Sequence, residues 1–165
     1  MKREVCLVPR KTTGATFAPF GQLIAPSVDG TPFGPSDAQL VLNDGTPRLY
    51  IMRLKQRGLA FDRITRHVRV TQCLAAIGGG EWLLAVSPPL APDDRAAMPD
   101  PASIQAFRIS GPVGIKLHRG TWHAGPFFTA PEMDFLNLEL ADTNETDHVD
   151  CHLGRDHEVT FRFEV

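Results

Sequence analysis

The fold is decided by one stretch of the sequence, Gly111-Pro112-Val113-Gly114-Ile115-Lys116-Leu117-His118-Arg119-Gly120-Thr121-Trp122-His123. Its first half reads as a strand that ends at His118, Gly120 suits a tight turn, and a second strand begins at Trp122. Two histidines five residues apart occur often by chance. The pair therefore becomes informative only through the residues around it.

The rest of the chain also reads as short strands joined by turns. Its 14 Gly and 14 Pro interrupt the apolar pattern so often that no amphipathic helix longer than about three turns can be drawn. Gly78-Gly79-Gly80 separates a strand expected at residues 68–77 from one expected at 81–86 and so predicts a hairpin, and helix is expected only for a turn or two after Thr12-Thr13. Strands are also expected at residues 104–109, 113–118, 122–129, 133–140 and 159–165, with loops at 27–39 and 87–103. This pattern predicts an all-β sandwich or barrel.

Length and composition narrow the class of protein. We expect residues 1–165 to form one domain with one core. A formal net charge of -2 without blocks of like charge argues against a nucleic-acid surface, and no apolar run is long enough for a membrane span. The first residues lack the pattern of a leader peptide, so the expected location is the cytoplasm.

The stretch that ends at His123 resembles the second signature of the cupin superfamily, a Pro-x-Gly-x-x-His run. Here His118 occupies the proline position, Gly120 is the turn glycine, and His123 is the histidine that the turn delivers into the barrel. The resemblance implies a cupin-like double-stranded β-helix, which is a jelly-roll barrel, with one or two short helices.

The first cupin signature, His-x-His followed by a glutamate and a glycine, is matched less closely, by Thr65-x-His67, Gln72 and Gly79. Thr65 and His67 share one face of a strand, whereas Gln72 joins them only if the strand bends or bulges. A metal site formed by His67, Gln72 and His123 is predicted to be weaker than usual, because an amide oxygen is a poorer donor than a carboxylate. Alternatively, His67 and His123 satisfy hydrogen bonds inside the barrel.

Several segments, taken in order, resemble the ureidoglycolate lyase family. They are residues 17–24, residues 43–48, Arg66-His67 with Thr71-Gln72, His118-Arg119 with Trp122-His123, and Asp134-Phe135-Leu136. Together they span roughly residues 17 to 150, and an ordered set is more specific than any single motif. One segment departs from the family, which usually has an aspartate followed by Arg-Gly-Gly where this chain has Glu139-Leu140-Ala141-Asp142. Because of this departure, the alternative remains open that the protein is a paralogue with another substrate.

The resemblance implies an enzyme, a carbon–nitrogen lyase that cleaves (S)-ureidoglycolate to glyoxylate and urea in allantoin and purine degradation. It also implies a homodimer, a small carboxylate as substrate, and a divalent metal, recorded as nickel. Because the first signature lacks one histidine and the glutamate, the alternative is a non-catalytic cupin that binds a small carboxylic acid. A hydrolase would release ammonia in place of urea.

The chemistry of this substrate suggests roles for particular side chains. Its carboxylate needs a cation, for which Arg48 is the first choice and Arg53 the second, because arginine binds a carboxylate through two hydrogen bonds. A base must take the hydroxyl proton and an acid must protonate the departing nitrogen, and His118 and His123 suit these roles. A metal could instead polarise the substrate oxygens and leave His118 as the base.

Three further residues are expected at the site. The resemblance places Asn43 and Trp122 at the substrate. Glu139 either orients a histidine or forms an exposed salt bridge, and its parity puts it on the strand face opposite Asp134. The run Asp147-His148-Val149-Asp150-Cys151-His152 holds five potential ligands in six residues, but we expect a solvated loop rather than a metal site there.

Overall fold

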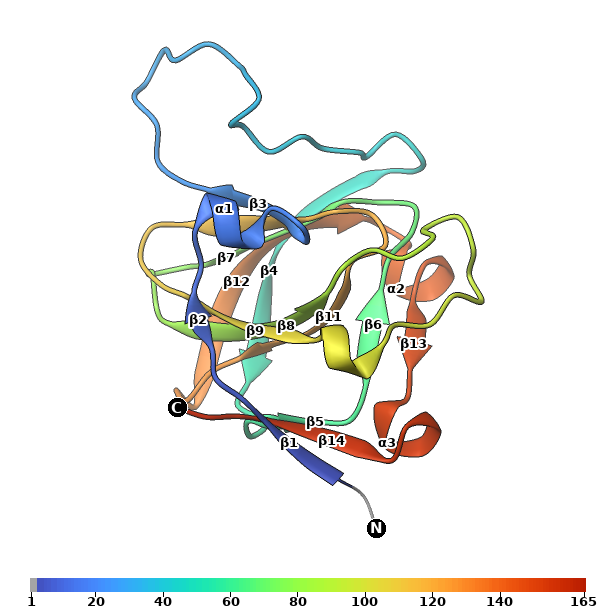
Figure 1. Ribbon diagram of the computed structural model, residues 1–165. Helices are drawn as coiled ribbons and strands as arrows, with labels where there is room; N and C mark the ends of the chain where they lie inside the picture. Colours follow the sequence, from blue (N-terminus) through green and yellow to red (C-terminus); the bar gives the residue numbers. More distant parts are fainter. Residues whose placement is uncertain (1–2) are drawn as a thin grey trace.

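The structure is a computed structural model that describes residues 3–165, and it consists largely of β-strands in three sheets (Figure 1). The five-stranded sheet has the order β3 (Gly21–Ile24), β10 (Gly114–Leu117), β7 (Gln72–Ala76), β12 (Glu132–Leu140) and β4 (Pro47–Lys55). The six-stranded sheet has the order β13 (Val149–Cys151), β6 (Ile64–Arg66), β11 (Trp122–Phe127), β8 (Trp82–Ser87), β9 (Gln105–Ile109) and β2 (Arg10–Lys11). In the three-stranded sheet, β14 (Val159–Phe163) lies between β1 (Arg3–Leu7) and β5 (Ala60–Phe61).

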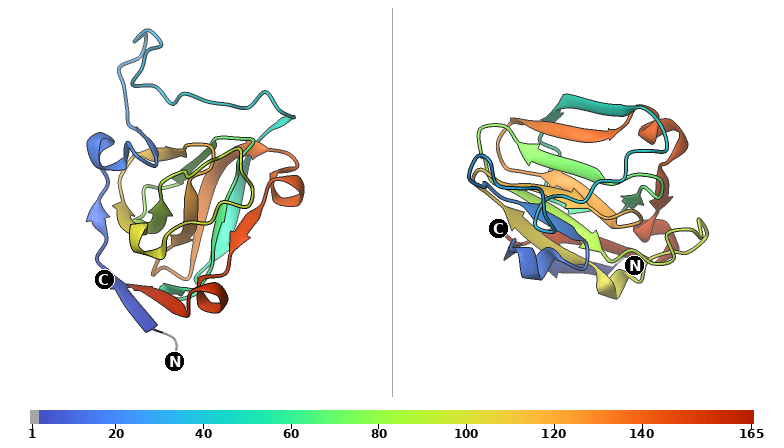
Figure 2. Two further views of the ribbon diagram at one scale, coloured as in Figure 1. Left: turned by 45° about the vertical axis from the view of Figure 1, so that its right-hand side comes forward. Right: turned by 90° about the horizontal axis from the view of Figure 1, so that it is seen from above.

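The two larger sheets are stacked on each other, as the view from above in Figure 2 shows. Trp82 of β8 and Phe135 of β12 meet edge to face between them, with ring centroids 5.2 Å apart. All six residues of β8 are buried, because the strand has apolar neighbours on both of its faces. Trp82, Leu84 and Val86 belong to the cluster between the larger sheets, whereas Leu83 and Ala85 belong to a second cluster. The all-β, cupin-like fold predicted from the sequence is confirmed.

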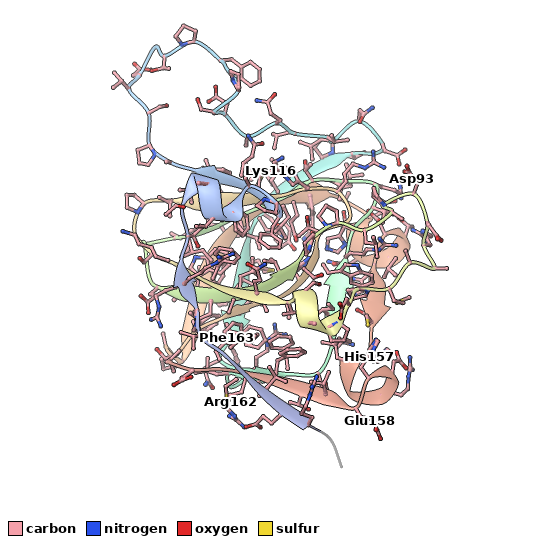
Figure 3. The ribbon with its side chains drawn as sticks, viewed as in Figure 1. Asp93, Lys116, His157, Glu158, Arg162 and Phe163 are labelled. Carbon is pink, nitrogen blue, oxygen red and sulfur yellow. The ribbon has the colours of Figure 1, made fainter. Side chains whose placement is uncertain are left out.

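The second cluster packs the six-stranded sheet against the three-stranded one. Phe61 of β5 and Phe161 of β14 stack in it, with ring centroids 5.4 Å apart. Along β14 the side chains alternate, so that Phe163 faces this cluster while Arg162 points outward (Figure 3). Every phenylalanine except Phe33 is buried, and removing these apolar rings from water stabilises the fold.

The predicted hairpin around Gly78-Gly79-Gly80 is wrong. β7 pairs with β10 and β12, whereas β8 pairs with β9 and β11, so the glycines carry the chain from one sheet to another. Gly78 and Gly79 have φ angles of +87° and +70°, which side chains with a Cβ rarely adopt. The strand expected from residue 68 also begins later, at Gln72.

Three short helices and one 3₁₀ turn accompany the strands. α1 (Gly14–Phe17) is the helix expected after Thr12-Thr13, and Thr13 and Thr16 cap it reciprocally. α2 (Thr143–Thr146) and α3 (Leu153–Asp156) come late in the sequence, and η1 (Pro101–Ser103) ends the loop before β9. Helix content thus exceeds the one or two helices expected. None of the helices among residues 3–165 has the length and apolar character needed to span a membrane.

Candidate functional site

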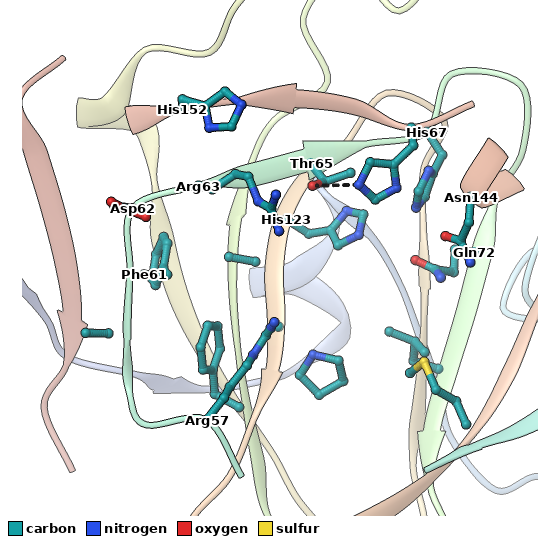
Figure 4. A pocket seen from close by; sticks show the side chains of 18 residues that line it. Arg57, Phe61, Asp62, Arg63, Thr65, His67, Gln72, His123, Asn144 and His152 are labelled. Atoms are coloured by element: carbon teal, nitrogen blue, oxygen red, sulfur yellow. Dashed lines mark hydrogen bonds between the residues drawn. The ribbon is translucent and has the colours of Figure 1, made fainter. Parts of the chain in front are cut away.

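A cavity of about 480 Å³ opens between the two larger sheets at the end near β6 and β7 (Figure 4). The five-stranded sheet contributes Met52, Gln72 and Leu74, and the six-stranded sheet contributes Thr65, His123 and Ala124. The rest of β11, the residue after β6, β5 with the loops around it, and the segment from α2 to just after β13 supply the rest of the wall. Its further lining residues are Arg57, Ala60, Phe61, Asp62, Arg63, His67, Gly125, Pro126, Phe127, Asn144, His148 and His152.

His67 is held in this cavity by Asp147. Its Nδ1 lies 2.6 Å from the Asp147 carbonyl oxygen, which can only accept, so Nδ1 carries the proton and Nε2 has a free lone pair. The Asp147 carboxylate accepts hydrogen bonds from the backbone amides of Val68 and Arg69, at 2.9 and 2.8 Å. These bonds explain why β6 ends at Arg66, because the amides that would continue a strand bind a side chain instead.

His123 is buried and lies beside His67, with ring centroids 5.2 Å apart. Its Nδ1 is 3.3 Å from the Thr121 carbonyl oxygen, which again places the proton on Nδ1 and leaves Nε2 unprotonated. Burial, and then the neighbouring charge of His67, lower the pKa of His123 to about 3. Burial also lowers the pKa of His67. The cavity therefore presents two neutral imidazoles at pH 7.

Gln72 belongs to a buried polar network. Its Nε2 donates to Glu139 Oε2 at 3.0 Å and to Asn137 Oδ1 at 3.2 Å, and Tyr50 donates to Glu139 Oε1 at 3.1 Å. Because the carboxylate only accepts, it dictates which way the amide is turned. The amide oxygen Oε1 is left buried without a partner among residues 3–165, and Figure 4 shows it turned toward the side of His123. An unpaired buried acceptor is costly and calls for a donor.

The chain bends as the first signature requires. Thr65, His67 and Gln72 all line the cavity, although Gln72 has the other parity, because residues 68–71 leave the strand conformation. Glu139 faces inward on β12 while Asp134 pairs with Arg53 outside, so the predicted opposition of the two carboxylates is confirmed. Glu139 touches Gln72 and Tyr50 and not a histidine, and it is not exposed.

His118 does not join the other histidines. Its Nε2 lies 3.1 Å from the Ala18 carbonyl oxygen and its Nδ1 lies 3.0 Å from Lys116 Nζ, next to α1 and outside the cavity lining. Gly120 lies in the turn between His118 and His123 and has a φ of +82°. Because side chains alternate between faces only along a continuous strand, the two histidines need not point to the same side. The expected convergence of three imidazoles at positions 67, 118 and 123 is therefore wrong for His118.

The predicted substrate-binding residues also lie outside the cavity lining. Trp122 is fully buried in the second apolar cluster beneath Arg66, whose guanidinium lies 4.8 Å from its ring centroid. Arg53 is on the outer face of β4 and forms two hydrogen bonds with Asp134. Arg48 is exposed and stacks over Tyr50 at 3.8 Å, and Asn43 is exposed in the loop before β4.

Sequence reasoning missed the residues that surround the two imidazoles. Arg57 and Arg63 flank β5 and enter the cavity wall, and His148 lies 5.6 Å from His67 between ring centroids. Asp147, from the run that we expected to be a solvated loop, is buried. The five potential ligands among residues 147–152 were the local signal that this segment belongs to the site. Arg57 and Arg63 carry no comparable signal, because the chain brings them inward only through the pairing of β5 with β14.

The donor set does not fit the expected metal site. Among residues 3–165, no group of three or more His, Cys, Asp and Glu side chains is placed to hold a metal ion. His67 and His123 each offer an Nε2, but the third expected donor is the neutral amide of Gln72, which Glu139 holds in place.

Comparison with known proteins agrees with this architecture. The family model described as ureidoglycolate lyase matches residues 4–160 of the 165-residue chain. The chain belongs to the ureidoglycolate lyase family. The match extends on both sides of the segments at residues 17–150 whose order suggested the family. A search of curated proteins found no match.

Proposed function

We propose that this protein is a ureidoglycolate lyase that cleaves ureidoglycolate to glyoxylate and urea. The observation that carries the proposal is the pair of unprotonated Nε2 atoms of His67 and His123 in the cavity of a chain that belongs to this family. The reaction breaks a carbon–nitrogen bond and needs one proton removed and one delivered. Both steps are within the chemistry of an imidazole.

His123 is the proposed proton carrier. Its Nε2 takes the proton of the carbinol hydroxyl while the carbon–nitrogen bond breaks, so that the hydroxyl oxygen becomes the aldehyde oxygen of glyoxylate. The departing nitrogen keeps the bonding electron pair and receives the same proton to give urea. One imidazole can serve both atoms because they are attached to the same carbon. The lowered pKa of His123, about 3, keeps its Nε2 lone pair unprotonated and available to the carbinol hydroxyl at neutral pH.

Gln72 is the proposed partner of the ureido group. Its buried Oε1 lacks a donor among the described residues, and a ureido N–H is such a donor. Glu139 acts through Gln72 as a positioning residue, because its carboxylate fixes the amide with Oε1 free. Gln72 can accept at Oε1 while its Nε2 donates to Glu139, whereas a glutamate at this position could accept from the ureido group but could not donate to Glu139 without a proton.

The proposed enzyme is a homodimer that pairs through the outer face of the five-stranded sheet. Leu49 and Ile51 of β4 and Leu136 of β12 are 62%, 60% and 41% exposed there, and Leu136 is directly opposite Ile51. An apolar hollow of about 570 Å³ continues this face toward Ile24 and Leu40. Contiguous exposed apolar surface of this kind marks an interface.

Product analysis tests the proposal. Purified protein incubated with racemic ureidoglycolate is expected to release urea and glyoxylate in equal amounts, and to stop when one enantiomer is consumed. Ammonia in place of urea would identify a hydrolase. Ligand-dependent thermal stabilisation with no product would identify the non-catalytic binder. His123→Asn, checked for an unchanged circular dichroism spectrum, controls for contaminating activity.

A further inference from the structure

Arg57 and Arg63 place two positive charges in the wall of the cavity. Arg57 lies in the turn between β4 and β5, and Arg63 lies between β5 and β6. In Figure 4 their side chains point toward one another from opposite sides of the wall, and the charge of Arg63 acts on Arg57. Two guanidinium groups that face each other in this way repel unless an anion lies between them.

Arg57 has no carboxylate partner within ion-pair distance among residues 3–165. Its guanidinium lies over the ring of Phe127, 4.5 Å from the centroid, and this contact fixes it at the cavity while leaving its N–H groups available. Partial burial of the guanidinium, and then the charge of Arg63, lower the pKa of Arg57. An anion beside Arg57 would relieve both effects.

Among residues 3–165, Arg63 is only weakly paired. Oδ2 of Asp150 lies 3.7 Å from Arg63 Nη1, and the Asp150 carboxylate already accepts a hydrogen bond of 2.5 Å from Thr65. Asp150 also lies 3.3 Å from His148 Nε2. Asp62, which does line the cavity, is seen in Figure 4 on the far side of Phe61 from His123. The ion pair of Arg63 thus leaves most of its donors for a ligand.

We infer that Arg57 and Arg63 together bind the carboxylate of the substrate and so select N-carbamoyl acids over uncharged ureido compounds. The inference rests on the proposed function and adds the direction in which the substrate lies. Figure 4 places His123 between Arg63 and Gln72, so a carboxylate at the arginines and a ureido group at Gln72 bring the intervening carbinol carbon to the imidazole. Arg48 and Arg53 are not needed for this contact.

The test is calorimetric titration with N-carbamoylglycine, which lacks the hydroxyl and cannot be cleaved, and with its uncharged carboxamide. The proteins are the wild type, Arg57→Gln, Arg63→Gln, the double variant, Arg48→Gln, and Arg162→Gln. Arg162 is an exposed arginine of β14 that pairs with Glu4, so its variant matches the change in net charge away from the cavity. Urea release by the wild type is measured in parallel and reports on the proposed function alone.

Loss of a charge-assisted hydrogen bond is expected to weaken binding of N-carbamoylglycine by about 10- to 100-fold in each single cavity variant. Binding of the carboxamide and the affinity of Arg162→Gln are expected to remain unchanged. The inference is overturned if the wild type binds acid and amide equally, if both cavity variants bind the acid like the wild type, or if Arg48→Gln alone weakens it. If the wild type releases no urea but both arginine variants lose binding of the acid, the proposed lyase activity is refuted and the carboxylate site stands.

Discussion

Replacement of Asp147 alters the support of His67 without changing a residue that lines the cavity. The side chain is buried, and its two carboxylate oxygens accept from the amides of Val68 and Arg69. Hydrogen bonds to charged groups contribute about 1.5–3 kcal/mol each, so Asp147→Ala is expected to lower the free energy of unfolding by about 3–6 kcal/mol. This is a large part of the about 5–15 kcal/mol typical of a folded domain. Asp147→Asn keeps one acceptor and is expected to cost about 1.5–3 kcal/mol.

Urea denaturation followed by circular dichroism measures both variants. Asp147→Asn is expected to lower the transition midpoint by about 1 M with an unchanged slope. It should also reduce kcat for urea release more than it raises KM, because the loop that carries His67 loosens while the cavity wall remains. Asp156→Asn is the matched control, since its carboxylate is exposed and bonds to the adjacent Arg155. Equal midpoints for Asp147→Asn and the wild type would refute the reasoning.

Three other predictions concern the proton carrier, the pH dependence and the interface. His123→Asn is expected to lower kcat by about 10²- to 10⁴-fold with native circular dichroism, and a rate within threefold of the wild type, roughly the scatter of such assays, would exclude His123 as the carrier. Because the pKa of His123 is lowered to about 3, the unfolded chain binds more protons than the folded one between pH 6.5 and 3, so stability falls as the pH decreases through that window. His123 changes the free energy of unfolding by at most about 1.4 kcal/mol per pH unit. Denaturation at pH 6.5 and 4.5 should therefore show a smaller loss of stability for His123→Asn than for the wild type. Ile51→Glu with Leu136→Glu is expected to convert the proposed dimer to a folded monomer in light scattering, whereas an unchanged dimer mass would place the interface elsewhere.

The local pattern of residues was sufficient to identify β8 to β12, β14 and two cavity histidines, but not the nine-residue strand β4. Alternation along a strand is a property of neighbouring residues, so the inward direction of Glu139 relative to Asp134 could be predicted from their spacing alone. The turn at Gly120 was also readable, because a positive φ needs glycine whatever the chain does afterwards. The ordered segments were enough to indicate the family that the comparison shows.

Tertiary structure alone decided which of these residues meet. The strands on either side of Gly78 pair with different partners far away in the sequence, so local alternation predicted a hairpin that does not form. His118 and His123 are separated by a turn, and only the packing of α1 shows that His118 is bound to the Ala18 carbonyl. Arg57 and Arg63 reach the cavity because β5 pairs with a strand at the end of the chain. Long-range pairing therefore determines the cavity's charge and contents, because it depends on contacts that no short window of sequence contains.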